Sequence, residues 1–296
     1  MFSKNKAIII FKTIFIILLS FSLISCTLTT YKNKFFSVPT HRLQWWLSDI
    51  NWDSKRCEYS GKNIKIAIID SGINSKHKDL KYCIEKEIKV SALKSSNSNN
   101  NEHGTEIAGI IAAYPHNDNG ILGIATDAKV ISIDITDSVN GEINEKDLIE
   151  GINIAIKEKA DIINLSLGLS KNSAELEKVI TTAVDSGIFI VAASGNTNSE
   201  LYPAVYDNVF SIDSYDRKGH FIYQKEHTNS VYLPGKNIVT SSKNDYSSVD
   251  GTSYSCAIFT GILALILEKN PNISYKQILK KTKGKKIDVN KILKGI

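Results

Sequence analysis

The sequence contains little cysteine, proline or methionine, with 4 Cys, 5 Pro and 1 Met among 296 residues. So few cysteines exclude a disulfide scaffold, and the composition is neither collagen-like nor that of a coiled coil. Neither sign of charge dominates, because 36 Lys and Arg residues are nearly balanced by 31 Asp and Glu residues, which gives a net charge of +5. Without an Arg-rich stripe, this small excess gives no indication of nucleic-acid binding. The 42% hydrophobic and 23% charged residues are typical of a globular protein, with room for one large domain or two small ones.

The N-terminus has the features of an export signal. Lysines precede an apolar run over residues 14–24, which is short for a membrane-spanning helix. The run ends in Ser25-Cys26, which resembles the lipobox of bacterial lipoproteins, where the cysteine is lipidated and becomes the mature N-terminus. An uncleaved N-terminal anchor is the alternative. We therefore expect residues 1–25 to be a signal peptide and Cys26 to hold the protein on the extracytoplasmic face of the cell membrane.

The rest of the chain shows no internal repeat and no change in composition that would mark a second domain. We expect a tether over 26–43 and one domain over 44–296, which begins with a docked Trp-rich arm over 44–52. Strand-like apolar runs alternate with helical patterns, which predicts an α/β fold with a mainly parallel central sheet and helices on both faces. The predicted strands are 64–69, 130–135, 161–167 and 188–193, and the predicted helices are 103–113, 145–159, 176–186 and 253–269.

Four polar residues lie where predicted strands end or predicted helices begin. Asp70 and Asn196 each follow a buried strand, while His103 and Ser253 each open a helix beside a glycine. Because sites in such sheets lie at the carboxyl ends of strands, we expect these side chains to meet. A serine hydroxyl needs a neighbouring base, and histidine, oriented by a carboxylate, is the natural base near neutral pH. A helix that begins at Ser253 also directs backbone N–H groups toward developing negative charge, and the Asn196 amide is a second donor.

The motifs around these residues resemble those of subtilisin-like serine proteases, and the resemblance covers nearly all of the chain after residue 44. The motifs are IAIIDSGIN (66–74), EHGTEIAGIIA (102–112), INLSLG (163–168), AASGN (192–196) and DGTSYSCAIFTG (250–261). The resemblance implies a three-layer subtilisin-like fold and a serine endopeptidase. It implies that Ser253 is the nucleophile, His103 its base and Asp70 the residue that orients the base. By the same resemblance, the Asn196 side chain and the Ser253 N–H form the oxyanion hole.

Two positions depart from the family pattern. Glu106 stands where the family usually has a second histidine, three residues after His103. After the nucleophile the family usually reads Met-Ala-Thr-Pro-His, whereas this chain reads YSCAI over 254–258, which changes the packing expected around Ser253. Neither departure touches proton transfer or the oxyanion donors, so an active enzyme is expected. The alternative from a different class is an inactive lipoprotein that captures peptides with the same fold.

The segment Ser166-Leu167-Gly168 resembles the family's edge strand that pairs with an extended substrate. We therefore expect a peptide or protein substrate bound by strand addition to a monomer. The resemblance places a specificity pocket between this strand and the segment that holds Ala193 and Gly195. Glu200, near the expected base of that pocket, either favours a basic substrate residue or is a solvated loop carboxylate, and both interpretations stay open.

Asp79 and Asn117 match calcium ligands of the family by the same resemblance, and oxygen ligands suit Ca²⁺. Alternatively, Asp79 caps a turn and Asn117 serves the backbone of its loop. No catalytic cofactor is expected. Besides the lipidation site, Cys57 and Cys83 are the conceivable disulfide pair after export, and three buried thiols, including Cys256, are the plainer alternative.

The length of the segment between Cys26 and the strand before Asp70 indicates the role of such a protease. Degradative subtilisins carry a folding prodomain there, by family resemblance, and this stretch is too short to hold one. The shortness resembles the leader peptidases that mature lantibiotics and related bacteriocins, some of which lack such a prodomain. We therefore expect removal of a leader from a precursor peptide, with general degradation as the alternative.

Overall fold

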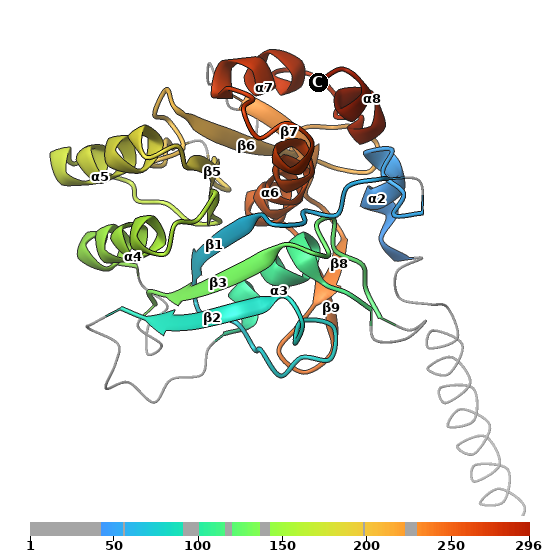
Figure 1. Cartoon of the computed structure of the whole chain (residues 1–296), viewed down its shortest axis with the longest axis horizontal. Helices are drawn as coiled ribbons and strands as arrows, with labels where there is room; N and C mark the ends of the chain where they lie inside the picture. Colours follow the sequence, from blue (N-terminus) through green and yellow to red (C-terminus); the bar gives the residue numbers. More distant parts are fainter. Residues whose placement is uncertain are drawn as a thin grey trace, which may run out of the picture.

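The computed structural model in Figure 1 describes residues 43–55, 57–90, 101–115, 120–136, 143–197, 199–222 and 230–296. The predicted signal peptide, Cys26 and the tether up to residue 42 lie outside the described residues.

A seven-stranded sheet forms the centre of the molecule. Most of its strands are rich in Ile and Val, whose branched side chains pack well on a pleated surface. The strand order is β2-β3-β1-β4-β5-β6-β7 and every neighbouring pair is parallel, so the carboxyl ends of all strands share one edge. The strands are β1 (Lys65–Asp70), β2 (Ile84–Lys89), β3 (Lys129–Asp134), β4 (Ile162–Leu165), β5 (Phe189–Ala193), β6 (Val209–Tyr215) and β7 (Ser230–Pro234).

Helices cover both faces of the sheet, as the sequence predicts, and the molecule therefore has three layers (Figure 1). One face carries α3 (Glu102–Ala112) and α6 (Thr252–Lys269), and the other carries α4 (Glu145–Lys157) and α5 (Ala174–Asp185). The α/β fold with a parallel sheet and helices on both sides is thereby confirmed.

The alternation of side chains along β1 divides the core into two. Ile66 and Ile68 point into the core beneath α3 and α6, whereas Ala67 and Ile69 point into the core beneath α4 and α5. Helix α6 is apolar around its whole circumference, which is the pattern of a helix buried on all sides. Its length and composition would suit a membrane span, but 83% of its apolar window is buried inside the protein, as in a core helix.

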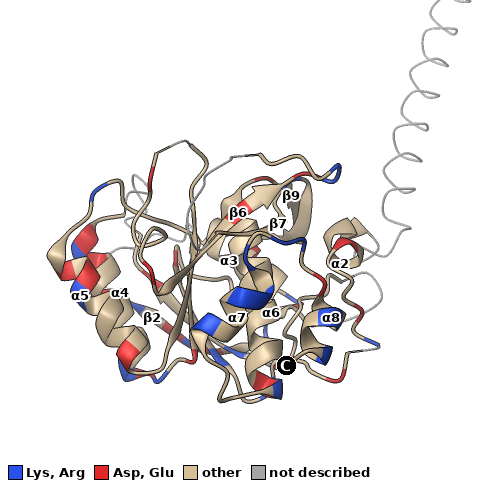
Figure 2. Ribbon diagram, turned by 90° about the horizontal axis from the view of Figure 1, so that it is seen from above, with Lys and Arg blue, Asp and Glu red and all other residues tan. Residues whose placement is uncertain are grey.

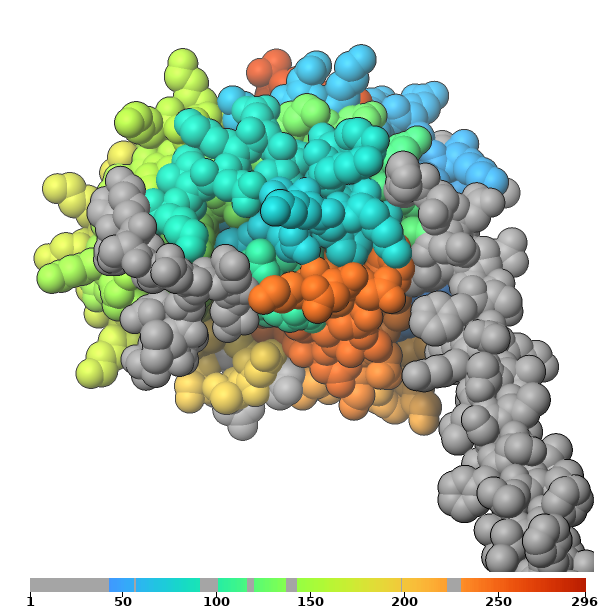
Figure 3. Space-filling view, turned by 90° about the horizontal axis from the view of Figure 1, so that it is seen from below, coloured from blue at the N-terminus to red at the C-terminus, as the bar shows by residue number. Residues whose placement is uncertain are grey.

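Three short helices lie together at one end of the molecule: α2 (Trp45–Asp49), α7 (Tyr275–Thr282) and α8 (Val289–Lys294) (Figure 1). The predicted Trp-rich arm is docked here, because Trp46 is fully buried and the Val289 N–H donates to the Ile50 carbonyl at 2.9 Å. An antiparallel hairpin of β8 (Ile238–Ser241) and β9 (Tyr246–Val249) packs on α3. Figure 3 shows the hairpin in orange at the surface, beside blue-green residues of the range 57–90.

Every predicted element forms, with ends displaced by a residue or two. The prediction missed β2, β6, β7 and the β8–β9 hairpin, and the Lys-rich C-terminal stretch contains two short helices. β2 reads IEKEIK at the edge of the sheet, where charged residues are tolerated. β6 carries Ser211 and Asp213 fully buried, and these polar residues break the apolar run that identifies a central strand.

Candidate active site

Polar residues meet at the carboxyl edge of the sheet, as the sequence predicts. Asp70 is the last residue of β1, Ser166 follows β4, and Asn196 lies just beyond β5. Because β4 lies between β1 and β5, these three strand ends are neighbours.

His103 reaches this edge from the first turn of α3. The start of α3 packs closely on the turn after β1, and a Cβ on Gly104 would lie 2.1 Å from the Gly72 carbonyl oxygen. Only glycine fits this position, and its N–H donates to Ser71 Oγ at 3.1 Å. The close contact places His103 Nδ1 at 2.9 Å from both carboxylate oxygens of Asp70.

The contact with Asp70 fixes which nitrogen of His103 carries the proton. A carboxylate only accepts hydrogen bonds, so Nδ1 carries the hydrogen and Nε2 keeps its lone pair. Burial lowers the pKa of His103, but the charge and hydrogen bond of Asp70, with a contribution from the Glu106 charge, outweigh burial and raise the pKa above its usual value. The Asp70 side chain is 3% exposed and the His103 side chain 37% exposed, so the base is accessible while its partner is not.

Ser253 reaches the same edge from the first turn of α6. The helix begins after Gly251, whose φ of 144° is a conformation that L-residues rarely adopt. The N–H groups of a first turn have no acceptor within the helix and lie at the positive end of its dipole. Ser253 Oγ donates to the Ser166 carbonyl at 2.9 Å. Catalytic hydrogen bonds between a nucleophile and its base often tighten only when substrate binds, so this is the resting position of the hydroxyl.

The Asn196 amide is oriented by the residue before the nucleophile. Asn196 Oδ1 accepts the Thr252 backbone N–H at 3.0 Å and the Thr252 hydroxyl at 3.1 Å. Because a backbone N–H can only donate, the side-chain oxygen must face Thr252, and the Nδ2 donor is left on the other side of the amide. Thr252 Oγ1 also accepts the Gly195 N–H at 3.2 Å, which joins the end of β5 to the start of α6.

A buried polar network beneath Ser253 was missed by the sequence prediction. Asn164 on β4 is fully buried, and its Nδ2 donates to Ser166 Oγ at 3.0 Å. Ser166 Oγ in turn donates to the Ser253 carbonyl at 2.9 Å. Thr260 and Cys256, both on α6, donate to Asn164 Oδ1. A lone asparagine in an otherwise apolar strand is the sequence signal that could have found this network.

The predicted substrate strand lies beside the nucleophile. Gly168 packs on the next segment, because a Cβ there would lie 3.0 Å from Leu201 Cβ, and Leu169 forms an antiparallel bridge with Tyr202. Ala193 is the last residue of β5 and Gly195 lies just beyond it, and both are buried.

The Glu200 side chain is exposed. Its two interpretations, recognition of a basic substrate residue and a solvated carboxylate, stay open.

The two predicted calcium ligands have different outcomes. Asp79 is buried, and its Oδ2 accepts the Ile121 N–H at 3.0 Å and the Tyr246 hydroxyl at 2.7 Å. Asn117 lies outside the described residues. Within the described ranges, no group of three His, Cys, Asp or Glu side chains is placed to hold a metal ion.

The three described cysteines are free thiols rather than a disulfide pair and a single thiol. Cys83 and Cys256 are buried and Cys57 is half-buried. Burial raises the pKa of Cys83 to about 12, so this thiol is inert rather than reactive.

These features together define the class of the site. A buried carboxylate, an imidazole with a lone pair on Nε2, a serine at a helix start and an oriented amide are the parts of a serine hydrolase.

Comparison with known proteins identifies the family. The chain belongs to the subtilase family, whose model, Peptidase_S8, matches residues 61–291. Subtilisin DY of Bacillus licheniformis is 35% identical over 229 residues, which are 74% of this chain and 82% of that protein. The major intracellular serine protease of Bacillus subtilis (strain 168) is 34% identical over 224 residues, 70% of this chain and 69% of that protein. Subtilisin E of the same strain is 35% identical over 230 residues, 74% of this chain and 59% of that protein.

A solved structure supports the same fold. The crystal structure of a cold adapted subtilisin-like serine proteinase aligns with a TM-score of 0.68 at 21% identity, covering 80% of this chain and 89% of that chain. The protein is therefore a subtilisin-like serine peptidase, and its substrates are peptides or proteins.

Proposed function

We propose that Ser253, His103 and Asp70 act as the catalytic triad of a serine endopeptidase. Ser253 Oγ attacks the scissile carbonyl carbon and gives its proton to His103 Nε2, and Asp70 holds the imidazole in the required tautomer. His103 then donates that proton to the leaving amine, and water hydrolyses the acyl-enzyme by the reverse sequence. The observation that carries this proposal is the contact of His103 Nδ1 with both Asp70 oxygens at the strand edge where Ser253 opens α6.

The oxyanion hole in this proposal has two donors. The first is Asn196 Nδ2, whose direction is set by the two hydrogen bonds from Thr252 to Oδ1. The second is the Ser253 backbone N–H in the first turn of α6. In this proposal both donate to the negative charge that develops on the carbonyl oxygen, and such stabilisation is the largest single contribution in many acyl-transfer enzymes.

A fluorophosphonate probe tests the proposal without knowledge of the substrate. The probe reacts with a serine only where a base activates it, so the wild type is expected to become labelled at Ser253 and Ser253→Ala to remain unlabelled. A matched control is Ser255→Ala, because Ser255 lies two residues along the same helix in the buried core. An unlabelled but folded wild type would mean the inactive, peptide-capturing alternative.

We propose further that the enzyme removes a leader from a precursor peptide rather than degrading proteins in bulk. The support is the resemblance to leader peptidases together with the position of α2. The arm that contains α2 packs on α8 as part of the catalytic domain, which leaves only residues 27–43 between Cys26 and that domain. A lantibiotic precursor should be cut once, at a rate far above that for casein. Equal rates for the two substrates would favour the degradative alternative.

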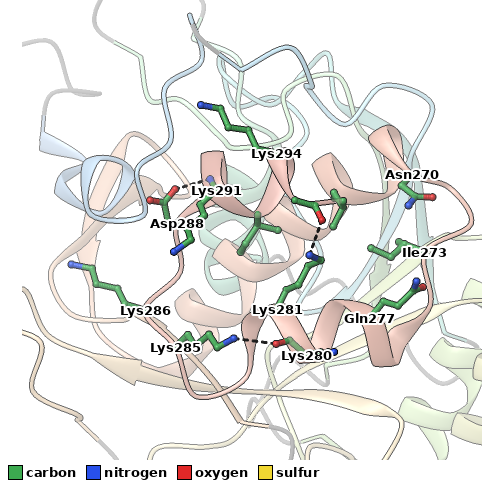
Figure 4. A pocket seen from close by; sticks show the side chains of 13 residues that line it. Asn270, Ile273, Gln277, Lys280, Lys281, Lys285, Lys286, Asp288, Lys291 and Lys294 are labelled. Atoms are coloured by element: carbon green, nitrogen blue, oxygen red, sulfur yellow. Dashed lines mark hydrogen bonds between the residues drawn. The ribbon is translucent and has the colours of Figure 1, made fainter.

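We propose that lipidated Cys26 anchors the enzyme to the outside of the cell membrane. One observation about the described residues supports a membrane-facing orientation. A groove of about 1020 Å³ between α7 and α8 is rimmed by lysines, as Figure 4 shows, and the ribbon of the same two helices has blue segments, the colour of Lys and Arg, in Figure 2. We call it the basic groove, and its lysines are Lys280, Lys281, Lys285, Lys286, Lys291 and Lys294.

The basic groove lies beside the C-terminal end of α2, in the N-terminal arm of the domain. Asn51, just after α2, donates to Asp288 at the start of α8, and Lys286 pairs with Asp49 of α2 at 2.8 Å. In this proposal the basic groove is the surface of the domain that faces the membrane. Lysines close to an anionic lipid surface contribute about 1 kcal/mol each, so the groove would hold the domain against the membrane.

Two fractionation experiments test the anchor and the groove separately. Cys26→Ala is expected to release the protein from washed membranes, and retention of that variant would point to an uncleaved N-terminal anchor. With Cys26 intact, changing Lys280, Lys291 and Lys294 together to Gln should leave the protein on membranes but make its domain more accessible to added protease. The control changes three exposed lysines on the α4–α5 side, Lys157, Lys171 and Lys178, to Gln. Equal accessibility in both triple variants would remove the groove from the proposal.

We propose a structural Ca²⁺ ion beside Asp79. Asp79 is a buried carboxylate at a loop, which suits a calcium ligand. Its Oδ2 already accepts hydrogen bonds from two neutral donors. Asp79 would supply an oxygen ligand that stabilises the loop. Chelation is expected to lower the midpoint of thermal unfolding and added Ca²⁺ to restore it. An unchanged midpoint would leave Asp79 as a residue that fixes its loop by hydrogen bonds alone.

A further inference from the structure

The two departures from the family pattern contact each other. Glu106, which replaces the usual histidine on α3, accepts a hydrogen bond from the hydroxyl of Tyr254, which replaces the usual methionine on α6. The distance from Tyr254 Oη to Glu106 Oε2 is 2.8 Å, and both residues are buried. The two residues at which this chain departs from the family pattern are therefore direct neighbours in the fold.

The contact joins the two helices that carry the base and the nucleophile. Glu106 lies one helical turn after His103, and Tyr254 is the residue directly after Ser253. The other carboxylate oxygen of Glu106 accepts the Ser247 hydroxyl of β9 at 3.0 Å. Each carboxylate oxygen thus has a donor, which is what a carboxylate only 7% exposed requires. The hairpin also holds the backbone here, because Thr240 Oγ1 donates to the Glu106 carbonyl at 2.6 Å.

The pair also faces the catalytic base. The ring of Tyr254 lies 5.8 Å from the ring of His103, between centroids. Burial raises the pKa of Tyr254, and the neighbouring charge of Glu106 raises it further, so the phenol remains a donor. Burial also raises the pKa of Glu106, against the two hydrogen bonds and the His103 charge that favour its ionised form.

The titratable groups around His103 come from three elements. Asp70 on β1 and Glu106 on α3 both raise the pKa of His103, and Tyr254 on α6 is neutral. Glu102, on α3 as well, acts on Glu106, and Asp250, just before α6, acts on Tyr254. Glu106 is therefore the second carboxylate, after Asp70, whose charge acts on the base.

We propose that Glu106 and Tyr254 are positioning residues that lock α3 to α6 beside the triad and keep a second negative charge next to His103. This inference rests on the proposed catalytic function of His103 and Ser253. It assigns two roles that separate chemically: the hydrogen bond sets the position of the nucleophile relative to the base, and the charge sets the pH at which the base loses its proton.

The experiment measures the rate of fluorophosphonate labelling of Ser253 as a function of pH. Labelling needs neutral His103, so its rate rises with pH through the pKa of His103 to a plateau. Glu106→Gln removes the charge and keeps an oxygen that can accept from Tyr254. Because the negative charge that raised the pKa of His103 is gone, the rising limb should shift to lower pH while the plateau is retained.

Tyr254→Phe tests the other role. It removes the hydrogen bond and keeps the carboxylate, so the plateau rate should fall about tenfold, the scale of a lost hydrogen bond to a charged group. The rising limb should stay at higher pH than in Glu106→Gln. The double variant should combine the lower plateau of Tyr254→Phe with the rising limb of Glu106→Gln, because the hydrogen bond and the charge have separate roles.

Glu102→Gln is the matched control, since it removes a carboxylate from the same turn of α3 that does not act directly on His103. Its rising limb should remain near that of the wild type. Equal shifts in Glu102→Gln and Glu106→Gln would overturn the charge role, and an unchanged plateau in Tyr254→Phe would overturn the positional role.

Two further measurements separate the possible failures. If the wild type is not labelled at any pH, the proposed function fails and not only the role of the pair. If thermal unfolding shows that the Glu106→Gln protein is not folded, Glu106→Asp is measured in its place. The aspartate retains the charge but is too short to reach Tyr254, so this variant should resemble Tyr254→Phe. A rising limb for Glu106→Asp at lower pH than in the wild type would also overturn the charge role.

Discussion

The two faces of the sheet begin their helices in different ways. On one face, α4 and α5 start with local side-chain caps: Asn144 accepts the Asp147 N–H at 2.9 Å, and Ser173 accepts the Leu176 N–H at 3.0 Å. On the other face, α3 and α6 start at Asn101 and Gly251, and neither residue makes a side-chain cap hydrogen bond.

The uncapped helices use partners from distant parts of the chain instead. The Gly104 N–H of α3 donates to Ser71 Oγ after β1, and the Thr252 N–H of α6 donates to Asn196 Oδ1 after β5. Local caps stabilise a helix wherever it lies, whereas these contacts fix where a helix begins relative to a strand end. The α4–α5 face therefore supports the fold, and the α3–α6 face positions the residues of the proposed triad. Substitutions on the two faces should separate stability from activity.

The largest expected effect is on the α3–α6 face, at Ser253. Ser253→Ala removes the nucleophile, and in subtilisin the equivalent loss costs about 10⁶-fold in kcat. The free energy of unfolding should change by less than about 1 kcal/mol, because a small side chain is only shortened. Peptide hydrolysis and thermal unfolding of the same preparation check both halves. Substantial peptidase activity in the variant would contradict the division of labour between the faces.

Asn196→Ala is expected to have the next largest effect. It removes one oxyanion donor and leaves the Ser253 N–H, so kcat should fall about 10²–10³-fold. KM should change little, because the oxyanion forms only after attack. A loss that appears in KM alone would mean that Asn196 binds substrate rather than stabilising the transition state.

Thr252→Val sharpens the comparison, because Thr252 serves both stability and orientation. The valine keeps the shape and the backbone N–H, but the hydroxyl that joins Gly195 to Asn196 is lost. Leaving the buried Gly195 N–H without this acceptor should cost about 1–3 kcal/mol of unfolding free energy, and a less restrained amide should lower kcat about tenfold. Kinetics and denaturant unfolding measure the two effects. A change in unfolding alone would show that the backbone contact suffices to orient Asn196.

The same contrast explains what the sequence predicts well. The elements of the α4–α5 face have regular apolar periods, and each cap residue lies within four positions of the backbone N–H that it accepts. The pattern of a short segment therefore contains the information needed to predict these helices. The proposed triad residues Asp70, His103 and Ser253 could be selected from the sequence because they lie in short motifs beside glycines that have steric reasons to be there. Gly104, for example, leaves no room for a side chain against the Gly72 carbonyl.

What the sequence did not predict depends on contacts between distant segments. The Glu106–Tyr254 hydrogen bond joins residues 148 positions apart, so each looked like an isolated departure from the family pattern. Strand β6 lies inside the sheet because β5 and β7 flank it, and its own polar residues give no sequence signal of a buried strand. The orientation of the Asn196 amide likewise requires Thr252, which no periodicity connects to β5.

The smallest expected effect is on the α4–α5 face. Ser173→Ala removes the cap of α5, which should lower the free energy of unfolding by about 1 kcal/mol and leave kcat and KM unchanged. The control is Thr181→Ala in the same helix, where an exposed hydroxyl only donates back to the Glu177 carbonyl. Because alanine is the better helix former, this control should be neutral or slightly stabilising. If Ser173→Ala lowered kcat as well, the start of α5 would be coupled to the triad across the sheet, and the two faces could no longer be treated as a scaffold and a catalytic layer.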